Sequence, residues 1–224
     1  MSEMGGAITR NGLLLAAFAI ATALLVASAF LGTRDRIAEA QRAAEEKALL
    51  EIVPRAIHDN EMLDDVVPAP VGEPLLNLSD QRSIYIARRG GSASAVVIPA
   101  IAPDGYSGDI ELIVGVMRNG EIAGVRVLQH RETPGLGDAI DHRKSPWIES
   151  IRGRSLTNPE AAQWTVKKDG GVFDQFTGAT ITPRAVVKAT ARVLEYVERN
   201  RDVLFPEQRA EGLPDIEKPG EAPL

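Results

Sequence analysis

The most conspicuous pattern in the chain is an uninterrupted apolar run, Gly12–Leu31, which contains no charged residue. About 20 apolar residues in a helix match the hydrocarbon core of a bilayer, so the run predicts one transmembrane helix. The alternative is a cleaved signal peptide, because Ala27-Ser28-Ala29 resembles a small-residue cleavage site. The run continues past that site at full spanning length, which favours an uncleaved anchor. Lysine and arginine counting slightly opposes an N-terminus inside the cell, since Arg10 precedes the run while Arg34 and Arg36 follow it.

A charged segment follows the apolar run. Residues 34–52 are rich in Ala, Glu, Arg and Lys, which predicts a helix. Its apolar stripe is narrow, so we expect a solvated stalk; the stripe consists of Ile37, Ala40, Ala44, Leu49 and Ile52. The prolines and acidic residues of Pro54–Glu73 then indicate a linker or loop.

Alternation of apolar and polar residues predicts a β-region in the middle of the chain. Ser94–Pro99 is a short apolar run, and in Gly108–Met117 every second residue from Ile110 is apolar. Asn119-Gly120 is a preferred pair for a two-residue hairpin turn with positive φ at both positions. The return strand is Glu121–Gln129, and its expected core residues are Ile122, Val125 and Val127.

A second helix is predicted near the end of the chain. Thr182 is its expected N-cap and Pro183 occupies the first turn. Apolar residues then recur at helical spacing and are expected to face the core: Val186, Ala189, Thr190, Val193, Leu194 and Val197. The Pro- and Glu-rich tail from Pro206 is expected to be disordered. Together these patterns predict an α+β fold, a twisted antiparallel sheet with flanking helices, plus one N-terminal transmembrane helix.

Composition narrows the possible functions. The net charge is −6, which argues against a nucleic-acid partner. The chain has no cysteine, which excludes disulfides, thiolate catalysis and iron–sulfur ligation. His58, His130 and His142 show no metal-ligand spacing, so we expect no metal site.

Three short motifs could carry chemistry. In Asp174–Thr180, small residues run directly into the start of the second helix, where a phosphate could meet a hydroxyl; taken alone, such a segment is more often a capped loop. Glu132–Gly137 contains Pro-Gly, typical of a type II turn with Gly135 at positive φ. Gly105–Gly108 places glycines around Tyr106, either for ligand contact or simply to punctuate a strand.

The three motifs, taken together and in this order, resemble those of the covalent FMN-binding domain. They read Gly-Tyr-Ser-Gly, Glu-Thr-Pro-Gly-Leu-Gly and Asp-x-x-Thr-Gly-Ala-Thr. That domain is shared by the G subunit of the Rnf complex and the C subunit of the sodium-pumping NADH:quinone reductase. The resemblance covers nearly the whole chain. Three features resemble the Rnf protein more than the quinone-reductase subunit: Lys167–Gly171, the segment from Thr177 to Val187 and the short length of the chain.

The resemblance implies one FMN, linked by a phosphoester to Thr180. Asp174 matches the acid that a flavin transferase needs when it moves FMN from FAD. Thr177, Gly178 and Ala179 would line the phosphate end. The remaining expected contacts are Glu132, Thr133, Leu136 and Gly137 to the flavin, with Tyr106, Trp147 and Lys168 as further contacts.

At the level of function, the resemblance implies a single-pass electron-transfer subunit of an ion-translocating ferredoxin:NAD oxidoreductase, a redox carrier that is no enzyme on its own. It places the flavin domain on the periplasmic side of a bacterial inner membrane. The implied partners are other membrane and redox subunits, membrane lipid and the transferase. The alternatives are the quinone-reductase C subunit and a non-redox membrane-tethered scaffold.

The expected domain organisation has four parts. Residues 1–33 are the anchor, 34–66 the juxtamembrane helix and linker, 67–205 the FMN-binding domain and 206–224 the tail.

Overall fold

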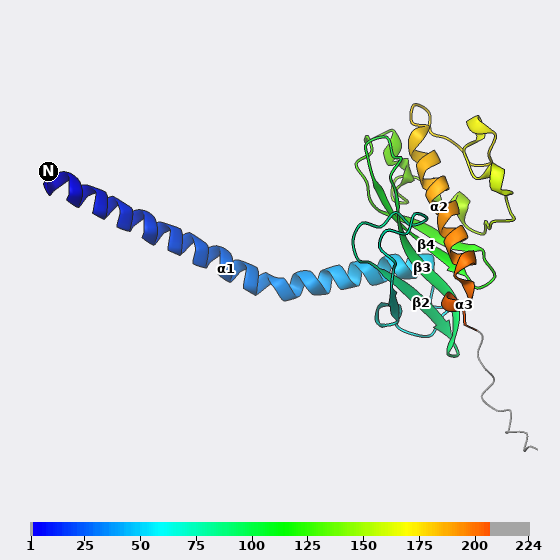
Figure 1. Cartoon of the computed structure of the whole chain (residues 1–224), viewed down its shortest axis with the longest axis horizontal. Helices are drawn as coiled ribbons and strands as arrows, with labels where there is room; N and C mark the ends of the chain where they lie inside the picture. The colour runs from blue at the N-terminus through cyan, green and yellow to red at the C-terminus, as the bar shows by residue number, and fades with distance from the viewer. Residues whose placement is uncertain (1, 207–224) are drawn as a thin grey trace, which may run out of the picture. The chain divides into compact units, whose positions relative to one another are not determined.

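The computed structural model describes residues 2–206, and the side chains of all of these except 2–9, 29, 35, 38 and 41. The predicted tail therefore lies, apart from Pro206, outside the described residues. The chain divides into two compact units, one up to Lys47 and one from Ala48 onward. Helix α1 (Ser2–Ile52) supplies the described part of the first unit and begins the second (Figure 1). Within α1, Arg10–Arg34 is long and apolar enough to cross a membrane.

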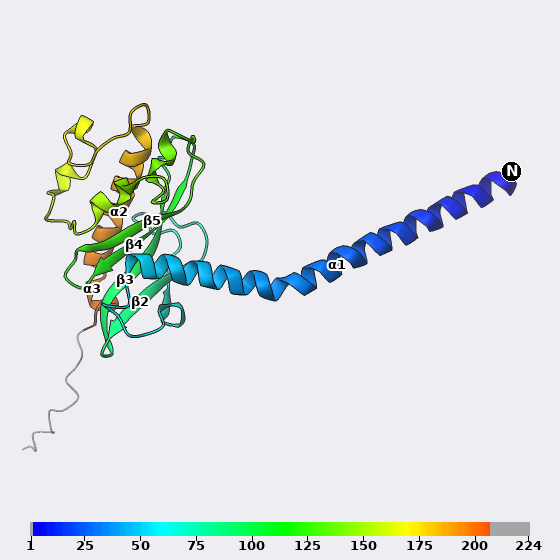
Figure 2. The same ribbon diagram turned by 180° about the vertical axis from the view of Figure 1, so that it is seen from behind.

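The second unit is built on a five-stranded antiparallel sheet, as the alternating pattern predicted. Its strands are β1 (Val66–Pro68), β2 (Ser83–Arg89), β3 (Ser92–Ala102), β4 (Ile110–Met117) and β5 (Ile122–Gln129), in the order β1-β2-β3-β4-β5. Helix α2 (Ile181–Arg199) lies on one face of the sheet and is followed by the short α3 (Arg201–Leu204) (Figures 1 and 2). The short helical turns are η1 (Met62–Asp64), η2 (Gly137–Ile140), η3 (Pro146–Ile151), η4 (Ala161–Gln163) and η5 (Lys167–Asp169).

The main core lies between the sheet and α2. The predicted alternate residues of β4, from Ile110 to Val116, are all buried there. Their partners on β5 are offset by register shifts, so that Val116 pairs with Ile122 and Val114 with Val125. The predicted buried face of α2 is also confirmed, since its six predicted core residues are buried.

The other face of the sheet is covered by the end of α1, which corrects the expectation of a stalk solvated along its whole length. Leu49 and Ile52 are fully buried in a second core that includes Val97 and Ile113. The sheet is adapted to this packing, because a Cβ added to Gly115 would come within 2.2 Å of the Ile52 side chain. The last turn of α1 is thus part of the globular unit.

An ion-pair cluster around one buried arginine links the last turn of α1 to the sheet. Arg126 on β5 is 7% exposed and pairs with Glu51 of α1 at 3.2 Å and with Glu149 of η3 at 2.7 Å. His142 lies 3.3 Å from the same Glu51 carboxylate. Because buried charges are costly unless paired, this arrangement favours one position for the last turn of α1.

The hairpin turn between β4 and β5 differs from the prediction. Gly120 has φ +87°, but Asn119 is not among the non-glycine residues with positive φ. The Gly120 amide donates to the Met117 carbonyl at 2.8 Å, and the Met117 amide donates to Glu121 at 2.8 Å. This is a three-residue loop, in which a type I turn is followed by a left-handed glycine. The Asn119 side chain accepts from the Glu121 amide instead of taking the left-handed position.

The segment expected to be a linker, Pro54–Glu73, also contains more structure than predicted. It holds η1 and the edge strand β1, which pairs with β2 through Val66–Tyr85 and Pro68–Ser83. An edge strand needs a ladder on one side only, so a proline is tolerated there. That is why a Pro-containing segment can still form a strand.

Candidate functional site

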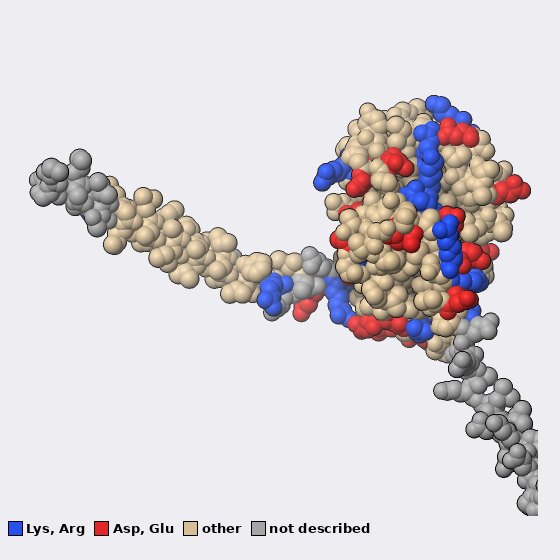
Figure 3. Space-filling model, viewed as in Figure 1, with Lys and Arg blue, Asp and Glu red and all other residues tan. Residues whose placement is uncertain are grey.

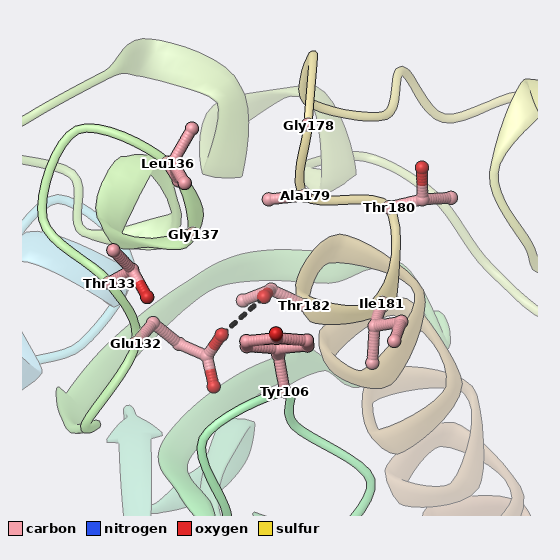
Figure 4. Close-up of a pocket in the computed structure, with 10 residues that line it drawn as sticks. All are labelled: Tyr106, Glu132, Thr133, Leu136, Gly137, Gly178, Ala179, Thr180, Ile181 and Thr182. Carbon is pink, nitrogen blue, oxygen red and sulfur yellow. Dashed lines mark hydrogen bonds between the residues drawn. The ribbon is translucent and has the colours of Figure 1, made fainter.

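A cavity of about 220 Å³ lies between the turn that follows β5 and the loop that precedes α2 (Figure 4). It brings together eight of the twelve residues singled out from the sequence: Tyr106, Glu132, Thr133, Leu136, Gly137, Gly178, Ala179 and Thr180. Two more residues, Ile181 and Thr182, complete the lining. The three motifs, which are far apart in the sequence, therefore meet at one place.

The first wall of the cavity is the predicted type II turn. The Leu136 amide donates to the Thr133 carbonyl at 3.1 Å, and Gly135 has φ +78°. The Gly135 amide also donates to the Asp138 carboxylate at 2.7 Å, which ties the turn to η2. A side chain at Gly135 would be strained in this backbone conformation, so the Pro-Gly pair sets the shape of this wall.

The second wall is the start of α2, and here the predicted cap is wrong by two residues. The N-cap is Thr180, and Thr182 lies inside the first turn. Thr182 is fully buried, and its hydroxyl donates a hydrogen bond to the Glu132 carboxylate instead of capping the helix. The Thr180 hydroxyl makes no capping hydrogen bond. The Thr180 hydroxyl is therefore available for a covalent bond at the N-terminus of α2.

The Glu132–Thr182 hydrogen bond joins the two walls (dashed line in Figure 4). The other carboxylate oxygen of Glu132 accepts from the Ser107 amide at 2.9 Å, which attaches the Gly105–Gly108 motif as well. A Cβ on Gly137 would come within 2.8 Å of both Glu132 and Thr182. The second glycine of the turn motif is thus required by close packing against this pair.

Four predicted site residues lie outside the cavity lining. Thr177 is exposed and directly precedes the lining segment that begins at Gly178. Asp174 has a side chain that is 70% exposed and pairs with Lys167 at 2.6 Å. Lys168 is exposed, and its backbone amide donates to Gln175 at 3.2 Å. These three side chains therefore lie outside the cavity lining, and their predicted contacts stay predictions.

Trp147, the fourth of these residues, contacts the Asp174–Thr180 segment outside the cavity lining. Its indole N–H donates to the Asp174 carbonyl at 2.7 Å, and its ring meets Phe176 edge-to-face at 5.1 Å. Edge-to-face aromatic pairs contribute about 0.5–1.5 kcal/mol beyond their buried area. Trp147 thus holds the Asp174–Thr180 segment in place rather than lining the cavity.

The substitution Trp147→Phe tests this support. It removes the indole donor and leaves the Asp174 carbonyl without this partner, so we expect a loss of about 0.5–1.5 kcal/mol in the free energy of unfolding. Trp164→Phe is the matched control, because the Trp164 indole donates to the Ser155 carbonyl at 3.3 Å and not to the Asp174–Thr180 segment, while its ring packs against the preceding Phe173 at 5.3 Å. Limited proteolysis should show faster cleavage near Gln175 in Trp147→Phe alone. Equal cleavage in the two variants would contradict the assignment.

Several charged side chains near the Asp174–Thr180 segment lie outside the cavity lining. Arg184 donates to Asp169 at 2.6 Å, and this hydrogen bond holds the pKa of that carboxyl below its usual range. Lys168 and Lys188 act on Asp169 in the same direction. Figure 3 shows Lys and Arg side chains gathered in a column over the face of the domain where α2 runs. Acidic side chains lie beside this column, so the charges on this face are mixed.

Comparison with known proteins identifies the class and then the family. Residues 105–195 match the FMN-binding domain family and residues 1–52 match the RnfG N-terminal region, so the cavity belongs to an FMN-binding domain. The chain is 52% identical over 203 residues to the G subunit of the ion-translocating oxidoreductase complex of Pseudomonas aeruginosa strain UCBPP-PA14, and the match covers 91% of this chain and 94% of that protein. The chain belongs to the family of G subunits of the ion-translocating oxidoreductase complex.

The similarity extends to other bacteria. The corresponding G subunit of Vibrio atlanticus is 46% identical over 90% of this chain and 96% of its own. The crystal structure of Shewanella oneidensis NqrC covers 61% of this chain and 69% of its own at 23% identity, with a TM-score of 0.43, too low for any comparison of the sites. Membership of the family makes this chain part of a multi-subunit membrane complex and confirms the resemblance to the Rnf protein.

Proposed function

We propose that this chain carries FMN through a phosphoester on Thr180 and transfers electrons within a ferredoxin:NAD oxidoreductase-type complex. The observation that carries the proposal is the position of Thr180, at the edge of the cavity and at the N-cap of α2, with a hydroxyl that makes no capping bond. When bound, FMN supplies the redox chemistry, and the chain supplies binding, orientation and electrostatics.

The start of α2 suits a phosphate. The first backbone amides of a helix have no partner within the helix, and the helix dipole favours a negative charge there. A phosphate esterified to Thr180 retains roughly one negative charge, by analogy with phosphorylated side chains. Amides in the first turn of α2 would hold that charge, so the attachment point and the phosphate site coincide.

The lining of the cavity suits the flavin ring. It offers apolar and aromatic side chains, with Tyr106, Leu136 and Ile181 exposed at the rim. At about 220 Å³ the cavity is smaller than the ~300–1,000 Å³ typical of small-molecule pockets. It can therefore cover only part of an FMN. A covalent link retains a cofactor that such limited burial would hold weakly, and this agrees with a phosphoester.

The exposure of Asp174 supports recognition by a flavin transferase. Its side chain lies on the surface, where a second protein can reach it, and six residues before the attachment site. We propose that α1 anchors the chain in the bacterial inner membrane, with the flavin domain on the periplasmic side and the neighbouring redox subunits as electron partners. The membrane-tethered scaffold remains the competing function.

Coexpression with a flavin transferase tests the proposal. We expect the full chain to show flavin fluorescence in a denaturing gel, and mass spectrometry to show a single added FMN on the peptide that contains Thr180. Omitting the transferase should remove both signals. Absence of flavin in both analyses, with a transferase shown to be active on another substrate, would favour the scaffold function.

A further inference from the structure

Glu132 is a buried carboxylate that has no counter-ion among the described residues. It is 4% exposed, and its two oxygens accept one hydrogen bond each, from the Ser107 amide and from the Thr182 hydroxyl. Within the described part of the chain, no lysine, arginine or histidine forms an ion pair with it. The other buried carboxylate, Asp141, is 5% exposed and is paired with Arg143 at 2.6 Å. Glu132 is thus the exception among the buried acids described.

A buried carboxylate without an opposite charge nearby is energetically unfavourable. Moving a carboxylate out of water costs several kcal/mol, which an opposite charge normally offsets. Two neutral donors replace only part of its hydration, since an ionised carboxylate has about four acceptor positions. For fold stability alone, a glutamine could accept from Ser107 and keep nearly the same shape. Fold stability therefore does not account for a glutamate, rather than a glutamine, at position 132.

The Glu132 carboxylate has a distinctive position in the cavity lining. Of the ten residues that line the cavity, Glu132 alone has an ionisable carboxylate, and no lysine or arginine is among them. In Figure 4 it lies between the Pro-Gly turn and the start of α2, with Tyr106 beside it. A charge in a water-poor environment acts more strongly on its surroundings than one in bulk solvent. Any redox group in this cavity is therefore exposed to a fixed negative charge.

We propose that Glu132 lowers the reduction potential of the bound flavin, because its uncompensated negative charge opposes the arrival of an electron in the same cavity. This inference rests on the proposed function, that FMN occupies the site. The hydrogen bonds from Ser107 and Thr182 hold the carboxylate in place without neutralising its charge.

Redox titration of the flavin-loaded full chain tests the proposal, followed by the absorbance of the flavin. Glu132→Gln removes the charge and keeps the shape, so we expect its potential to shift to a more positive value. Glu132→Asp keeps the charge, and its potential should stay closer to that of the wild type. Thr182→Val removes a hydrogen bond but no charge, and should not raise the potential. Unloaded protein should show that Glu132→Gln melts within a few degrees of the wild type.

The possible outcomes separate the roles of this residue. An unchanged potential in Glu132→Gln, or an equal rise in Thr182→Val, would overturn the proposal, because a packing change would then explain the result. If Glu132→Gln takes up no flavin, the carboxylate serves attachment or folding, and the proposal fails. Absence of flavin from the wild type itself is a different result, which rejects the proposed function.

Discussion

Replacing Thr180 by valine is expected to abolish covalent flavin while leaving the fold intact. Valine keeps the branched shape of threonine but has no hydroxyl, so no phosphoester can form. The Thr180 side chain makes no capping hydrogen bond, and for that reason the free energy of unfolding should change by no more than about 0.5 kcal/mol. Fluorescence in a denaturing gel, measured after coexpression with a flavin transferase, checks the first point and urea unfolding the second.

Two neighbouring threonines provide matched controls for Thr180→Val. Thr177→Val changes an exposed side chain of the same loop and should retain the fluorescent band. Thr182→Val breaks the hydrogen bond to Glu132, so it should load less flavin but still show the band. A band that persists in Thr180→Val and disappears in one of the two controls would move the attachment site to that residue.

The substitution Ile52→Ala is expected to cause the second large effect. Ile52 is fully buried at the end of α1 and touches the strands where Gly115 and Gly124 leave room for it. Shortening a fully buried isoleucine to alanine costs about 2–5 kcal/mol, because it removes apolar contacts and leaves a cavity. Urea unfolding of the full chain in detergent, followed by tryptophan fluorescence, should show this loss.

Ile37→Ala is the matched control for this measurement. It is the same change in the same helix, but Ile37 is 50% exposed, so its effect should stay within about 0.5 kcal/mol. Equal stability of the two variants would show that the last turn of α1 contributes nothing to the globular unit. The burial of Leu49 and Ile52 would then have no energetic consequence.

The parts of the fold that the sequence predicted are those in which one local pattern determines the outcome. The alternation in β4 and the helical spacing in α2 each define a buried face, and both faces are buried as expected. The Pro-Gly turn at residues 133–136 follows from backbone preferences alone. In each case the information lies within a short continuous stretch of the chain.

The parts that could not be predicted depend on contacts between distant segments. The sequence predicts Thr182 as a helix cap, but its hydroxyl donates to the buried carboxylate of Glu132, 50 residues earlier. Leu49 and Ile52 form too narrow a stripe to indicate burial, and only the glycines of β4 and β5 reveal the surface that receives them. The contact of Trp147 with the flavin stays a prediction, but the hydrogen bond from its indole to the Asp174 carbonyl is one that no side-chain pattern can signal.

The way in which the cavity is held together has a consequence for the order of maturation. Its walls are joined by hydrogen bonds within the protein, made by the Glu132–Thr182 pair, the amide of Ser107 and the indole of Trp147. Because these bonds need only protein groups, we expect the folded domain to be the substrate of a modifying enzyme. We expect that enzyme to recognise a folded surface around Asp174, so that a short unstructured peptide spanning Asp174–Thr180 would be modified far more slowly.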